Sequence, residues 1–245
     1  MGAIITTAIF VFLAAGGCGF AAGEDPVGAA GAGQDASNTT PPDAGEPSLS
    51  QKESGEKIDI KISATGEDEK MIRDALDLLK QMNGEHATNG YDEKWRDTKL
   101  NVSKVMNKLH EQGCDEIGMD QCGPGETACV NPQNPSKVRI TPEVRKLPPT
   151  MRSMVMGHEC NHTGKGRPNY MHAMCPEGHE YAGKPACDTD AHGSYASMTT
   201  TFGNVAKFCT TCTGLVTGDA RKIRDSQMKR LLGEAKEKVS SDVGQ

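Results

Sequence analysis

Apolar and polar residues first alternate regularly at residues 58–63, IDIKIS, which predicts a half-buried strand. From Met71 to Met82 the apolar residues recur at helical spacing, which predicts an amphipathic helix. The same spacing predicts a second helix over residues 94–112. The folded part of the chain is therefore expected to begin with a strand and two helices.

The middle of the chain has no long periodic segment. Residues 113–136 are rich in Cys, Gly and Pro, which is typical of a loop held together by disulfides. Residues 137–141, KVRIT, alternate again and predict a second strand. A third helix is expected after Pro148 and Pro149, because the first N–H groups of a helix lack partners anyway.

The C-terminal half is predicted to be mainly helical. The third helix is expected to end at Gly164. An irregular loop, a fourth helix and a last amphipathic helix follow, over residues 165–185, 186–208 and 219–239. The predicted fold class is α+β, with a small mixed sheet, the third helix beneath it and a helical C-terminal half.

The N-terminus predicts export. Residues 3–15, AIITTAIFVFLAA, form an apolar stretch of signal-peptide length, and small residues and Cys18 follow. This pattern resembles a bacterial lipoprotein signal, which implies a signal peptide over residues 1–17 and a lipid on Cys18. The alternative is an ordinary signal peptide cut near Ala21. We therefore expect an exported protein, either a cell-envelope lipoprotein of the outer membrane or cell surface, or a secreted protein.

Composition separates a tether from a domain. Residues 18–57 are rich in Gly, Ala, Asp, Ser, Thr and Pro, which predicts a disordered tether and leaves residues 58–245 as one folded domain. Hydrophobic residues make up 36% and aromatic residues 4%, so the core is expected to be thin. The net charge of −6 argues against binding to nucleic acid or to an anionic membrane surface. No apolar run is long enough to span a membrane, so membrane contact is expected only through the lipid on Cys18.

The cysteine count favours disulfides. Apart from Cys18 the chain has eight cysteines, an even number that four disulfides would use completely. Four cross-links at about 2–4 kcal/mol each would compensate for a thin core. Cys209 and Cys212 form a CxxC pair that ends a predicted helix rather than opening one, so we expect a structural disulfide there.

Two histidines carry the predicted chemistry. His158 and His162, in the segment HECNH, are four positions apart on a predicted helix, so both imidazoles leave the same face. This geometry suits two Zn²⁺ bonds of about 2.0–2.1 Å. Glu159 projects to the side, where it can reach a water on the metal and accept its proton. His158 and His162 are therefore predicted metal ligands, and Glu159 the predicted general base.

The HECNH segment is an HExxH motif and resembles that of zincin metalloproteases of the gluzincin and aspzincin type. The resemblance covers roughly residues 137–206. It implies an upstream edge strand that binds an extended peptide, for which residues 137–141 are the candidate. The segment CDTDAH is similar to the E-x-x-A-D signature of this group, which implies Asp188 as the third zinc ligand and His192 behind it on the same helix.

Several roles stay open at this point. The third ligand is Asp188 or one of three alternatives, His192, Asp190 and Glu180. Tyr195 is either a packing residue or a donor to an oxyanion. The other histidines are assigned no role: His86, His110, His172 and His179.

The predicted function is zinc-dependent hydrolysis of peptide bonds in a protein or peptide substrate. A disulfide between Cys160 and Cys187 is suggested as the link that draws the two ligand-bearing helices together. The alternative is an inactive exported lipoprotein that binds metal or serves as a disulfide-rich structural module. The presence of Glu159 argues against it, because metal binding alone does not need that residue. Cleavage preference, oligomeric state and an inhibitory role for part of residues 58–136 stay open.

Overall fold

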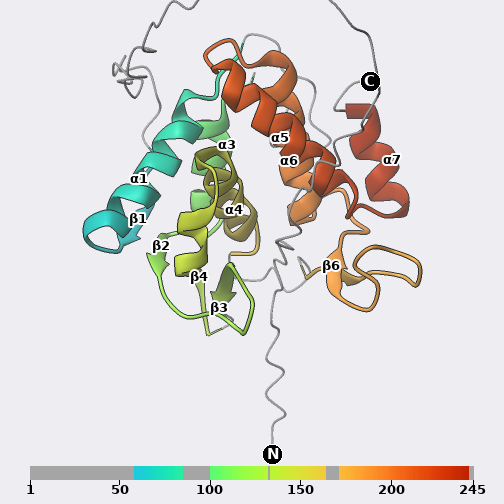
Figure 1. Cartoon of the computed structure of the whole chain (residues 1–245), viewed down its shortest axis with the longest axis horizontal. Coiled ribbons are helices and arrows are strands. Elements are labelled where there is room, and N and C mark those ends of the chain that lie inside the picture. Colours follow the sequence, from blue (N-terminus) through green and yellow to red (C-terminus); the bar gives the residue numbers. More distant parts are fainter. Residues whose placement is uncertain (1–57, 85–99, 132, 164–170, 243–245) are drawn as a thin grey trace, which may run out of the picture. The chain divides into compact units, whose positions relative to one another are not determined.

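A computed structural model describes residues 58–84, 100–131, 133–163 and 171–242, all within one compact unit (Figure 1). The predicted signal peptide, the lipid site at Cys18, the tether and the helix stop at Gly164 lie outside the described residues. The helices are α1 Gly66–Gln81, α3 Val102–Glu111, α4 Pro149–Asn161, α5 Ser194–Phe208, α6 Gly214–Met228 and α7 Gly233–Asp242, with a short 3-10 helix at Pro142–Lys146. The strands are β1 Lys61–Ser63, β2 Glu116–Met119, β3 Ala128–Asn131, β4 Asn134–Ile140, β5 Ala173–Met174 and β6 Pro185–Cys187. The mixed helix and strand content expected from the sequence is confirmed.

The main sheet has the strand order β1-β2-β4-β3. The first three of these strands are parallel, and β3 pairs antiparallel with β4. The prediction that residues 137–141 form an edge strand is wrong, because β4 lies between two partners. The edge is β3, which arises from a segment expected to be a loop. Strands β2 and β3 have four residues each, too few to show a period between their Cys- and Gly-rich flanks.

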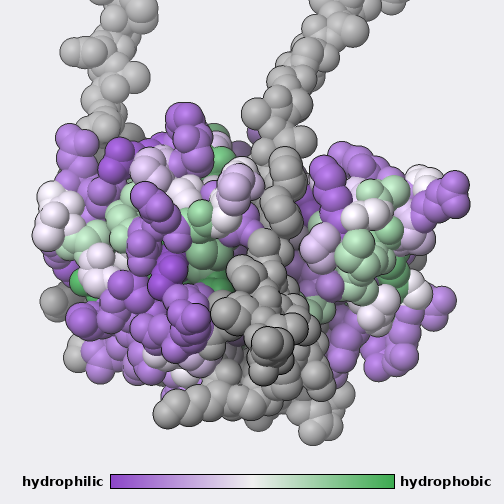
Figure 2. All heavy atoms as spheres, turned by 90° about the horizontal axis from the view of Figure 1, so that it is seen from below, coloured by the Kyte–Doolittle hydropathy of each residue, from purple (hydrophilic) through white to green (hydrophobic). Residues whose placement is uncertain are grey.

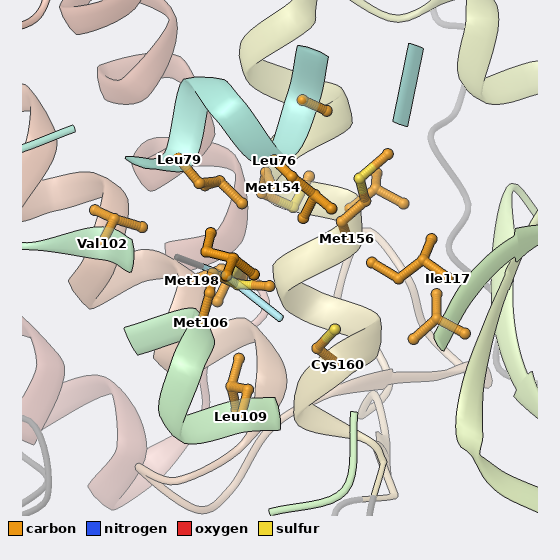
Figure 3. Close-up of a cluster of buried hydrophobic side chains, with 14 of the residues drawn as sticks. Leu76, Leu79, Val102, Met106, Leu109, Ile117, Met154, Met156, Cys160 and Met198 are labelled. Atoms are coloured by element: carbon orange, nitrogen blue, oxygen red, sulfur yellow. The ribbon is translucent and has the colours of Figure 1, made fainter. Parts of the chain in front are cut away.

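Helix α4 is the centre of the hydrophobic core. Its residues from Ser153 to Asn161 are all buried, so it is covered on every side rather than on one stripe. Figure 3 shows side chains of α1, α3, α5 and the sheet around it. Gly157 lets α5 approach closely, since a Cβ there would lie 3.1 Å from the sulfur of Met198. The C-terminal end of α4 is thus held firmly by packing.

The C-terminal half departs from the predicted helices. The predicted fourth helix begins only at Ser194, because residues 185–187 form β6 and a turn follows. The predicted last helix is two helices, α6 and α7, and α7 begins at Gly233, whose φ of 49° is in the left-handed region. Figure 1 shows α5, α6 and α7 beside the part that contains α4.

Four disulfides use all eight cysteines outside the N-terminal segment, as expected from their number. They are Cys114–Cys160, Cys122–Cys129, Cys175–Cys187 and Cys209–Cys212. The suggested Cys160–Cys187 pair is wrong, and the expected Cys209–Cys212 disulfide is confirmed. Disulfides in this number are compatible with an oxidising, extracellular compartment.

The described residues on one face of the molecule are mostly polar. On the face drawn in Figure 2, hydrophilic residues dominate and apolar residues are visible in separate areas. Within the described ranges, no helix has both the length and the apolar character needed to cross a membrane.

Candidate metal centre

Three histidine side chains meet at the C-terminal end of α4. His158 lies in its last turn, His162 is its C-cap residue, and His172 lies just before β5. Their Nε2 atoms are 3.2 Å apart in each of the three pairs. His158 and His172 are buried and His162 is partly exposed. The predicted pair is therefore brought together, and a third histidine completes the cluster.

Hydrogen bonding alone does not explain this cluster. Nδ1 of His172 is 2.7 Å from Oδ1 of Asp188 and donates its proton there, so Nε2 of the neutral ring carries only a lone pair. Because His158 and His162 offer one Nε2 proton each at most, at least one of the three contacts has no hydrogen bond. Nitrogen ligands at about 2.0–2.1 Å from a tetrahedral Zn²⁺ lie about 3.3–3.4 Å apart. The observed spacing fits that geometry, and the three residues could hold a metal ion.

Asp188, expected as the third ligand, lies behind His172 instead. Its second oxygen, Oδ2, accepts from the backbone N–H groups of Tyr195 and Ala196, at 2.7 and 3.2 Å. The expectation that Asp188 shares a helix with His192 is wrong. Asp188 directly follows β6 and forms a backbone bridge with Leu231, whereas α5 begins later. The structure thus places His172, not Asp188, beside the predicted histidine pair.

Tyr195 packs against the histidine cluster. Its ring stacks on that of His172, with centroids 4.1 Å apart, and lies 4.6 Å from the ring of His158. The hydroxyl accepts a hydrogen bond of 3.1 Å from the guanidinium of Arg230. Burial raises the pKa of Tyr195. Of the two predicted roles, this arrangement supports packing.

Glu159 is fully buried, and within the described ranges neither of its carboxylate oxygens has a hydrogen-bond partner. Burial, with a smaller contribution from the charge of Glu126, raises its pKa to about 8. Burial also holds the pKa of His158 well below its ordinary value of 6.5, assisted by His162 and His172. His158 therefore keeps its lone pair at neutral pH, whereas ionised Glu159 needs a nearby cation.

The remaining predicted alternatives lie outside the cluster. His192 is exposed, and its Nδ1 is 2.8 Å from Oδ1 of Asp190. Glu180 is exposed in a turn. None of the three belongs to the group around His158 that could hold a metal.

His172 is the site residue that the sequence analysis missed. It lies in an irregular segment, so no helical or strand period relates it to HECNH. The only available signal was its residue type, a histidine within a short distance downstream of the motif. Its place depends on the pairing of β5 with β6, which brings it next to Asp188.

Two other groups of side chains have metal-ligand spacing. They are Cys175, His179 and Cys187, and Cys122, Glu126 and Cys129. In both groups the cysteines are joined by a disulfide, so they offer no thiolate. The histidine cluster is therefore the metal candidate of the described residues.

Comparison of the chain with protein-family models, with curated proteins and with solved structures finds no match.

Proposed function

We propose that this protein is a zinc-dependent metallopeptidase in which His158, His162 and His172 hold the metal and Glu159 is the general base. The observation that carries the proposal is the set of three Nε2 atoms, 3.2 Å apart, at the end of the helix that also carries Glu159. Three protein ligands leave the fourth position of a tetrahedral zinc open, which is typical of catalytic rather than structural zinc sites.

The chemistry divides between metal and protein. Zinc would act as a Lewis acid and lower the pKa of water in its open position. The carboxylate of Glu159 would accept a proton from the attacking water and then deliver it to the leaving amine. Tyr195 and Asp188 would hold the ring of His172 in place while this happens.

The fold around the site supports the same proposal. The zincin resemblance implies an edge strand upstream of the motif helix, and β3 is an edge strand that packs against α4. An extended substrate peptide could add to β3 by backbone hydrogen bonds. We extend the proposal to a zincin-like domain that is exported, with a lipid on Cys18.

The test replaces Glu159 by Gln. We expect zinc to stay bound at one ion per chain and casein hydrolysis to fall by two or more orders of magnitude, because the proton acceptor is lost while all three histidines remain. Elemental analysis and a casein assay measure the two quantities. Glu177→Gln, at an exposed acid, is the matched control. Full activity of Glu159→Gln, or loss of its zinc, would show that the role assigned to Glu159 is wrong.

A second candidate function is metal binding without turnover. The burial of His158 and Glu159, at 2% and 0% exposure, favours it, since a hydrolytic site must admit substrate. Zinc-loaded protein that cleaves neither casein nor short peptides would support this alternative. A disulfide-rich module without a metal role would contain no zinc at all.

A further inference from the structure

Asp188 makes two sets of hydrogen bonds with its two carboxylate oxygens. Oδ1 accepts from Nδ1 of His172 at 2.7 Å, and both side chains are buried, at 1% and 4% exposure. Oδ2 accepts from the backbone N–H groups of Tyr195 and Ala196 in the first turn of α5. One carboxylate thus holds both a ring of the histidine cluster and the helix whose Tyr195 stacks on that ring.

The backbone of Asp188 is fixed as well. Its N–H donates to the carbonyl of Arg230 at 2.9 Å, and its carbonyl accepts from the N–H of Leu232 at 2.9 Å. These bonds join it to the segment between α6 and α7. Arg230 also donates to the hydroxyl of Tyr195. The segment between α6 and α7 therefore helps to fix where the Asp188 carboxylate lies.

Gly193 lies directly against the Asp188 carboxylate. A Cβ at Gly193 would overlap Oδ2 and Cγ of Asp188. The backbone of Gly193 is extended, so its lack of a side chain serves close approach rather than an unusual conformation. A methyl group at this position would displace the carboxylate without changing its chemistry.

From these contacts we infer that Asp188 is a positioning residue: it aims Nε2 of His172 at the metal and couples that ligand to α5 and the C-terminal helices. Accepting the Nδ1 proton fixes the ring's tautomer and orientation and makes Nε2 a better donor to a metal. The role rests on the metal centre of the proposed function, but not on hydrolysis.

The experiment measures metal affinity, with Zn²⁺ and Co²⁺ as probes, in the purified full chain. Asp188→Asn keeps one carbonyl oxygen but cannot accept on both sides. Gly193→Ala displaces an intact carboxylate. We expect both variants to bind Zn²⁺ about 10- to 100-fold more weakly and to change the visible spectrum of bound Co²⁺. Gly214→Ala is the control, because a Cβ there meets nothing within 4 Å.

Circular dichroism separates positioning from folding, because both variants should keep the helix content of the wild-type protein. If both variants fold, keep wild-type affinity and leave the Co²⁺ spectrum unchanged, the inference about Asp188 is wrong, but the proposed function is unaffected. A wild-type protein that binds neither metal would overturn it together with the proposed function. Should one variant fail to fold, the other still decides.

Discussion

At the scale of single residues, Glu159 is costly to ionise, because its buried carboxylate has no hydrogen-bond donor among the described residues. In the metal-free protein its pKa is about 8, against 4.5 when unfolded. The folded state then holds a proton that the unfolded state releases. The stability that the folded protein gains from holding this proton is complete below about pH 4.5 and is lost as the pH rises through about 8.

We therefore predict that Glu159→Gln stabilises the chelator-treated protein, and that its advantage over the wild type grows between pH 5 and pH 8. The gain should reach a few kcal/mol, because a neutral amide has no ionised form to bury. Guanidinium unfolding curves in EDTA at four pH values measure it. If the free energies of unfolding of the variant and the wild type changed in parallel with pH, the prediction that Glu159 becomes ionised in a buried position would be wrong. Glu177→Gln, at an exposed acid, should follow the wild type.

The contacts between the histidines of HECNH could be predicted from the sequence, whereas the contacts around Asp188 could not. His158 and His162 are related by the helical period alone, so their meeting could be predicted. His172 and Asp188 are related only through the pairing of β5 with β6 and the start of α5. No local rule specifies those contacts. The resemblance to E-x-x-A-D therefore predicts Asp188 as a metal ligand, and the sequence predicts no role for His172.

At the scale of elements, the β5–β6 pair holds the third histidine. Ala173, next to His172, pairs with Cys187, next to Asp188. The Cys175–Cys187 disulfide joins the residue that follows β5 to the last residue of β6. With only two and three residues, these strands have few hydrogen bonds of their own. The disulfide is buried at both ends, so it acts as a permanent brace.

Replacing Cys175 and Cys187 together by Ser should therefore weaken zinc binding by about 10-fold or more, because the contact between His172 and Asp188 loses its brace. Competition with a chelating dye measures the affinity. The matched control is the Cys209→Ser, Cys212→Ser double variant, whose disulfide lies at the junction of α5 and α6. Equal affinities for the two double variants would show that the brace is not needed by the site.

The element boundaries show which helices and strands could be predicted from the sequence and which could not. The start of α4 was predictable because Pro148 and Pro149 mark it, and α1 because its apolar period is long. The stretch before Ser194 is predicted as helical from the resemblance of CDTDAH to E-x-x-A-D, but it forms the end of β6 and a turn. The edge strand β3 was missed since its few residues gain their structure from pairing with β4.

At the scale of the molecule, the histidine cluster joins two regions of the described chain. His158 and His162 lie at the C-terminal end of α4, which packs among α1, α3, α5, α6 and the sheet. His172 belongs to the β5–β6 region, which the bonds of Asp188 tie to α5 and to the segment between α6 and α7. A metal bound to all three histidines would therefore cross-link these regions and should stabilise the fold as a whole.

We predict that zinc raises the melting temperature of the chelator-treated protein by roughly 5–15 °C at free zinc of 100 to 1,000 times Kd, corresponding to about 3–4 kcal/mol. The gain should shrink below about pH 6, because protons compete with the metal for imidazole lone pairs. His172→Ala should lose most of the zinc-dependent gain, since it removes the ligand from the second region. His192→Ala should retain it, because that exposed ring lies outside the cluster. Differential scanning calorimetry with and without zinc decides between these outcomes. An undiminished gain in His172→Ala would mean that the metal does not join the two regions, and loss of the gain in His192→Ala would return that residue to the ligand set.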